Sequence, residues 1–80
     1  QSVDIEGTVR ELGEEGVDAQ VLDISAMGFM ASSAAHFSVG ARVWLILPGR
    51  DRASAEVIWI DGDRLGAEFA EPISLEGLDL

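Results

Sequence analysis

The chain reads VDIEGTVR over residues 3–10, and this stretch alternates apolar and polar residues along its whole length. A period of two places successive side chains on opposite faces of a β-strand, whereas an amphipathic helix repeats about every 3.6 residues. The stretch therefore predicts a half-buried strand, and it favours an all-β fold for the chain around it.

Five further short segments rich in apolar residues follow, most of them alternating, and they are separated by clusters of turn residues such as Gly, Pro and Asp. They cover residues 17–23, 28–32, 42–47, 53–60 and 65–70. Six short strands at this spacing predict a small antiparallel barrel or sandwich. In so short a chain a closed barrel is favoured, because closure removes the exposed edges of the sheet.

Residues 42–47 are apolar on both faces, as expected of a central strand that is covered on both sides. Trp44 and Ile46 form the outer face of this strand. We expect them to be covered by a C-terminal helix or by a partner protein.

Composition excludes several classes of function. The 80 residues hold 15 acidic and five basic side chains, a formal net charge of −10, with no Cys and a single histidine, His36. Because all five basic residues are arginines, a Schiff-base lysine and a P-loop are excluded. Because the chain has no Cys, disulfides and thiolate metal sites are excluded as well. We expect no catalytic residues, no metal, no duplex nucleic acid partner and no membrane insertion.

We interpret residues 1–80 as one domain. Ser74 could cap a short or truncated C-terminal helix in which Leu75 and Leu78 share a face. The chain begins with Gln1 rather than Met, which leaves open whether the domain is trimmed at both ends.

The segment with the most chemical information is DISAMG, residues 23–28. Here a strand ends at a carboxylate, Asp23, a hydroxyl follows at Ser25, and Gly28 precedes the next strand. One interpretation is an Asx or Ser turn, in which Gly28 supplies a positive φ. The other is the rim of a ligand site, because a carboxylate can accept two N–H donors from a guanine edge and glycine admits a ligand to the backbone.

This segment resembles the D/N-x-S-x-x-G motif of the PilZ domains, small β-barrels that are receptors for cyclic di-GMP. The resemblance extends to residues 39–49, similar to that family's strand after the motif, and to residues 55–59 and 65–69, similar to its final hairpin. It covers nearly the whole chain, about residues 3–73. The expected fold is thus an all-β, six-stranded antiparallel PilZ-type barrel.

The resemblance implies a cytoplasmic regulatory domain of bacterial cyclic di-GMP signalling, with no other cofactor. Asp23 and Ser25 would contact a guanine, and Gly28 would shape the loop. The family's second signature, R-x-x-x-R, precedes the first strand and supplies arginines to the phosphates, but residues 1–4 do not contain it. We therefore expect these 80 residues to bind the nucleotide weakly or not at all, because each charge-assisted hydrogen bond lost costs about 1.5–3 kcal/mol.

The remaining candidates have simpler interpretations. Arg50 and Arg52 are expected to be solvated turn charges, the alternative being an anion contact beside the Asp23 rim. His36 is expected on the surface or half-packed, since no triad partner is recognisable. Trp59 shares the phase of Ala55 and is expected in the core or under a helix, rather than as a stacking platform.

Two functional hypotheses follow. The first is a receptor that binds cyclic di-GMP at the D-x-S-x-x-G rim when an upstream R-x-x-x-R is supplied. The second is a nucleotide-independent PilZ-like module whose apolar strand face and acidic surface engage a protein partner. The native residues immediately before Gln1 distinguish them, because an R-x-x-x-R there favours the receptor.

Overall fold

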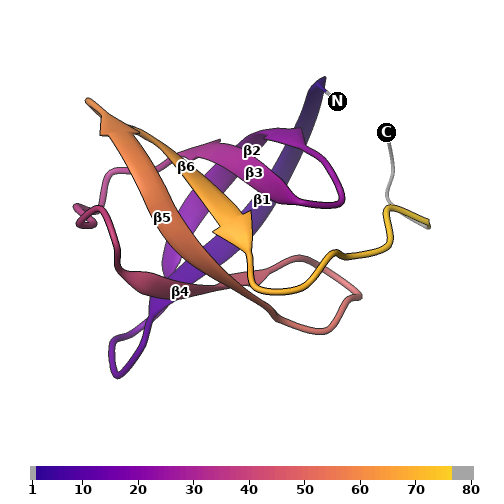
Figure 1. The fold of residues 1–80 in the computed structure, drawn as a ribbon. Coiled ribbons are helices and arrows are strands. Elements are labelled where there is room, and N and C mark those ends of the chain that lie inside the picture. Colours follow the sequence, from indigo (N-terminus) through magenta and orange to yellow (C-terminus); the bar gives the residue numbers. More distant parts are fainter. Residues whose placement is uncertain (1, 77–80) are drawn as a thin grey trace.

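A computed structural model describes residues 2–76 and shows six antiparallel strands that form one closed barrel (Figure 1). In chain order the strands are β1 Ser2–Glu11, β2 Val17–Ile24, β3 Gly28–Ser32, β4 Arg42–Ile46, β5 Ala53–Asp61 and β6 Arg64–Phe69. Around the barrel the order is β1-β2-β3-β6-β5-β4, and β4 pairs again with β1. The predicted all-β barrel and its six strands are confirmed, with boundaries within about a residue of those expected.

The length of β1 closes the barrel. Its first part pairs with β2, from Ser2 opposite Asp23 to Val9 opposite Val17, and its last four residues also pair with β4. Val9 accordingly lies opposite both Val17 and Leu45. The ten-residue strand β1 thus pairs with β2 on one side and with β4 on the other. Without its pairing to β4, the sheet would be open and would have two exposed edges.

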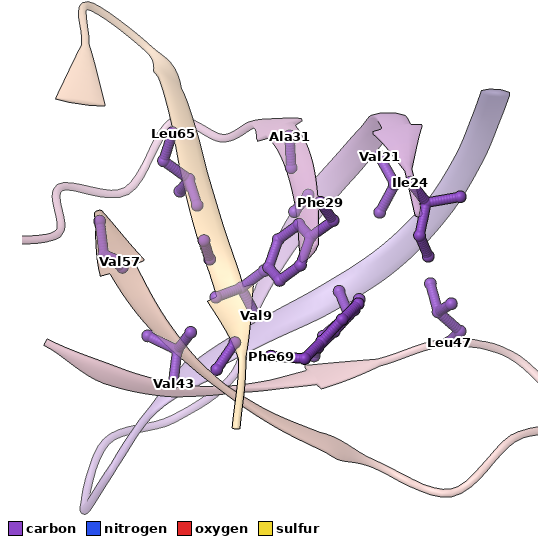
Figure 2. Packing of buried hydrophobic residues seen from close by; sticks show 14 residues of the cluster. Val9, Val21, Ile24, Phe29, Ala31, Val43, Leu47, Val57, Leu65 and Phe69 are labelled. Carbon is purple, nitrogen blue, oxygen red and sulfur yellow. The ribbon is translucent and has the colours of Figure 1, made fainter. Parts of the chain in front are cut away.

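The inward-facing residues of all six strands meet in a single core (Figure 2). The rings of Phe29 and Phe69 lie near its middle, with centroids 5.5 Å apart. Alanines at positions 31, 55 and 67 complete the lining, as suits a narrow six-stranded barrel whose interior is filled by side chains. The period of two read from the sequence therefore corresponds to a real division between core and outer face.

Outside the strands, the C-terminal segment differs from the expected helix, and the β5–β6 turn adds a detail that the sequence did not specify. No helix occurs between residues 2 and 76; the part of the expected C-terminal helix that includes Leu78 lies outside the described residues. Residues 70–76 instead run past the β2–β3 connection, where the Ile73 N–H donates to the Ala26 carbonyl at 2.9 Å. The β5–β6 hairpin turns at Gly62, whose φ of 63° is one that glycine adopts without strain.

Candidate functional site

The β2–β3 connection is a tight turn held by two hydrogen bonds of Ser25. The Ser25 N–H donates to the Gly28 carbonyl at 2.9 Å, and the Ser25 hydroxyl oxygen accepts from the Met27 N–H at 3.2 Å. The exposed Ser25 hydroxyl keeps its own hydrogen to donate. The turn interpretation and the ligand-rim interpretation of this segment are thus compatible, because the turn leaves the Ser25 O–H facing solvent.

Gly28 is required for a reason other than the expected one. It does not have a positive φ; the described glycines that do are at positions 13, 40, 49 and 62. A Cβ atom at Gly28 would instead lie 2.4 Å from the Ala67 carbonyl oxygen on β6. Gly28 therefore allows β3 and β6 to pair closely at the edge of the turn.

Asp23 reaches the outer face through a β-bulge. The β2–β3 register shifts between Val21 and Asp23, and the buried residues Val21 and Ile24 are three positions apart instead of two. Asp23, which is half-buried, thereby joins Ser25 and Gly28 at one edge of a groove. The three residues expected from the motif lie together there.

The groove is open, has a volume of about 310 Å³ and runs over the outer faces of β3, β6 and β5. Its floor contains Gly66, which lies between Met30 of β3 and Trp59 of β5. Further along the same face, Gly28 lies opposite Glu68. Sequence reasoning missed most of this lining, which comprises Met27, Phe29, Met30, Ile58, Trp59, Gly66, Ala67 and Glu68.

Trp59 is the clearest correction to the sequence-based expectations. It is 38% exposed and lies on the outer face, not in the core. The β5–β6 register shifts between Val57 and Trp59, so Ile58 is an extra residue and the side chains after it change face. The Trp59 indole covers Gly66, where a Cβ atom would be 2.0 Å from the indole nitrogen.

The charged groups that line the groove are both acidic, Asp23 and Glu68, and no arginine is among its described lining residues. Arg50 donates to the backbone carbonyls of Ser74 and Glu76. Arg52 stacks on Trp44, with its guanidinium carbon 4.3 Å from the ring centroid.

Arg52 is exposed in the turn, as expected of a solvated turn charge, and Arg50 is half-buried; each also has a local contact, and neither lines the groove beside Asp23. The cover expected over Trp44 is supplied at least in part by Arg52. His36 is exposed, as expected. Residues 2–76 contain no group of three or more His, Cys, Asp or Glu side chains placed to hold a metal ion.

Comparison with protein-family models matches residues 2–80 to the PilZ domain. The chain belongs to the PilZ domain family. No curated protein matches the sequence significantly. PilZ domains are in general regulatory receptor domains of the kind used in cyclic di-GMP signalling, and they are generally not enzymes.

Within this PilZ domain, the D-x-S-x-x-G segment and the beginning of β1 are neighbours. Ser2 pairs with Asp23, so the first residue of β1 lies beside the motif (Figure 1). Ile73 hydrogen-bonds Ala26 within the same connection, which brings the C-terminal segment to this side of the barrel. In the described part of the chain, no helix has the length and apolar character needed to cross a membrane.

Proposed function

We propose that this PilZ domain is a cytoplasmic receptor that binds cyclic di-GMP along the Asp23–Gly28 edge of the groove. The observation that supports the proposal most directly is that Asp23, Ser25 and Gly28 line one edge of one groove. What favours a ligand there is the open space beside a half-buried carboxylate, Asp23, and an exposed hydroxyl, Ser25.

The chemistry of this edge suits a guanine base. A carboxylate has only acceptor sites, and guanine presents N–H donors along one edge, so Asp23 can accept two hydrogen bonds from it. Ser25 retains an O–H donor for a guanine acceptor. The exposed apolar surface of Trp59 and Met27 offers a wall against which a flat base can pack.

In this proposal the phosphates are bound by arginines on a segment joined before β1. The groove presents Asp23 and Glu68, and these carboxylates repel a ligand with two phosphates. Because Ser2 lies opposite Asp23, a segment joined directly before β1 would emerge at the groove edge. An R-x-x-x-R in that segment would supply bidentate contacts that residues 2–76 do not place in the groove.

The proposal is tested by calorimetric titration of cyclic di-GMP into three proteins. These are residues 1–80, the same chain with an R-x-x-x-R segment fused before Gln1, and that fusion with both added arginines replaced by alanine. We expect millimolar or undetectable binding by the first and third proteins and clear binding by the second. Submicromolar binding by residues 1–80 alone would refute the need for an added phosphate clamp.

The role of Asp23 is tested in the arginine-bearing fusion. We expect Asp23→Ala to weaken binding at least about tenfold, because two N–H donors lose a charged acceptor. The matched control is Asp18→Ala, an exposed residue of the same strand that does not line the groove. If neither substitution changes the affinity, the nucleotide does not bind at this edge.

A second candidate is a PilZ-like interaction module that acts without nucleotide. The observation that favours it is the acidic and apolar lining of the groove, in which Glu68 adds to Asp23 and no described arginine offsets them. Failure of the arginine-bearing fusion to bind cyclic di-GMP would support this candidate.

A further inference from the structure

We propose that the groove face docks a cationic amphipathic segment of a partner protein. The groove face is defined here by Met27, Glu56, Ile58, Trp59 and Glu68. This inference rests on the second candidate function, the interaction module that acts without nucleotide, and names the class of its partner; every groove-face residue that it uses lies among the described residues.

The apolar part of the groove face consists of three large side chains that are exposed together. Met27 is 56% exposed, Ile58 50% and Trp59 38%, and all three line the same groove. They come from the β2–β3 connection and from β5, which are far apart in the chain and are brought together because β6 pairs with both β3 and β5. Clustered apolar side chains of this size mark interaction sites more often than isolated ones do.

The bulge in β5 creates this exposure. A regular strand would turn one of two successive side chains inward, whereas the extra residue Ile58 leaves both Ile58 and Trp59 on the surface. The Trp59 indole in addition lies over Gly66, beside the groove. The local geometry thus presents two large apolar side chains together.

The charges of the groove face identify the occupant as cationic. Glu56 and Glu68 lie directly opposite each other on β5 and β6, and Arg42 lies opposite Glu56 on β4, so two carboxylates share one local guanidinium. Glu68 also lines the groove with Asp23, where no described arginine is present, so a lysine or arginine of the docked segment would lie beside these two carboxylates. The net charge of −10 also attracts a basic segment from a distance and raises its association rate.

The same charges disfavour the other apolar occupants. A second copy would bring another −10 domain and another pair of glutamates to the face. An anionic membrane would meet the same repulsion. A segment with large apolar side chains on one side and Lys or Arg beside them satisfies both parts of the surface.

The test uses a helical Leu/Lys peptide of about 18 residues, or about five helical turns, as probe. Two control peptides replace every Lys by Glu, or every Leu by Ser. The protein is residues 1–80 with Trp44→Phe, so that Trp59 is the remaining indole and its emission reports on the groove face. We expect the Leu/Lys peptide to shift the Trp59 emission to shorter wavelength and to bind more weakly as salt is added, with no shift from either control peptide.

Two matched pairs of variants locate the binding surface. Ile58→Ser is compared with Leu12→Ser, a 70% exposed residue that does not line the groove. The second pair consists of two double variants. The groove-face variant is Glu56→Gln with Glu68→Gln, and its control is Glu14→Gln with Glu15→Gln, which removes the same amount of charge away from the groove. We expect each groove-face variant to weaken peptide binding at least about tenfold and each control to leave it within about twofold.

Thermal melts of each variant establish that the barrel is intact. Equal binding of the Glu-substituted peptide, or equal effects of the matched controls, would overturn the proposal. Concentration-dependent dimerisation that shifts the Trp59 emission without peptide would also overturn it, because the occupant would then be a second copy. These measurements contain no nucleotide, so their failure is separate from failure of the cyclic di-GMP titrations.

Discussion

Gly28 and Gly66 show how single residues set the shape of the groove. At Gly28 the backbone of β6 occupies the place of a side chain, and at Gly66 the Trp59 indole does so. The first contact is with a carbonyl in a paired strand, which can move only if the sheet moves. The second is with a side chain that can rotate. The two glycines therefore differ in the kind of change that a methyl group would cause.

Gly28→Ala is expected to destabilise the domain by about 2 kcal/mol or more, within the range of overpacked cores, because the added Cβ would meet the Ala67 carbonyl oxygen. Urea unfolding followed by circular dichroism measures this loss. The comparison is Gly62→Ala, which meets no atom within 4 Å and has a φ of 63°. It should cost about 1–2 kcal/mol for the left-handed conformation alone. An equal or smaller loss at Gly28 would contradict the close-approach explanation.

At the scale of a strand, the period-two pattern predicts where strands lie but not where they bulge. Alternation, together with the doubly apolar run at residues 42–47 and the turn residues between segments, located the six strands. The segment DISAMG singled out Asp23, Ser25 and Gly28 because it interrupts the apolar pattern between two strands. The bulges near Asp23 and at Ile58 could not be predicted from the sequence. A bulge is defined by the pairing of two strands, and the extra residue needs no particular amino-acid type that the sequence would reveal. The face of Trp59 depends on Gly66 of β6, and the presence of Glu68 in the groove depends on strand pairing.

The C-terminal segment is an element without regular structure, and Arg50 ties it to the barrel. The guanidinium donates to the Ser74 and Glu76 carbonyls, and Ile73 bonds the β2–β3 connection. Arg50→Ala is expected to speed amide hydrogen exchange at Ile73 several-fold, because the segment then opens more often. Arg42→Ala is the control, since Arg42 contacts Ser54 on β5 and not this segment. Unchanged exchange at Ile73 in Arg50→Ala would show that the arginine does not hold the segment.

At the scale of the whole molecule, an acidic shell surrounds a closed apolar barrel. The interior is a single cluster of side chains from all six strands, so burial of apolar surface stabilises the fold. The charge of −10 then acts in two ways. It selects cationic partners at long range, and it works against the compact state through self-repulsion.

Salt should therefore stabilise this domain. Raising the ionic strength from about 0.01 M to about 0.15 M shortens the Debye length from about 30 Å to about 8 Å, which screens repulsion across a barrel of this size. We expect the Tm to rise, and about 1 kcal/mol of relief would raise it by about 4–8 °C. The variant Glu14→Gln with Glu15→Gln removes two charges from an exposed turn. It should melt higher than the parent at low salt and respond less to added salt. A Tm that falls as salt is added would mean that attractive ion pairs outweigh self-repulsion, and the acidic shell would then contribute to stability rather than oppose it.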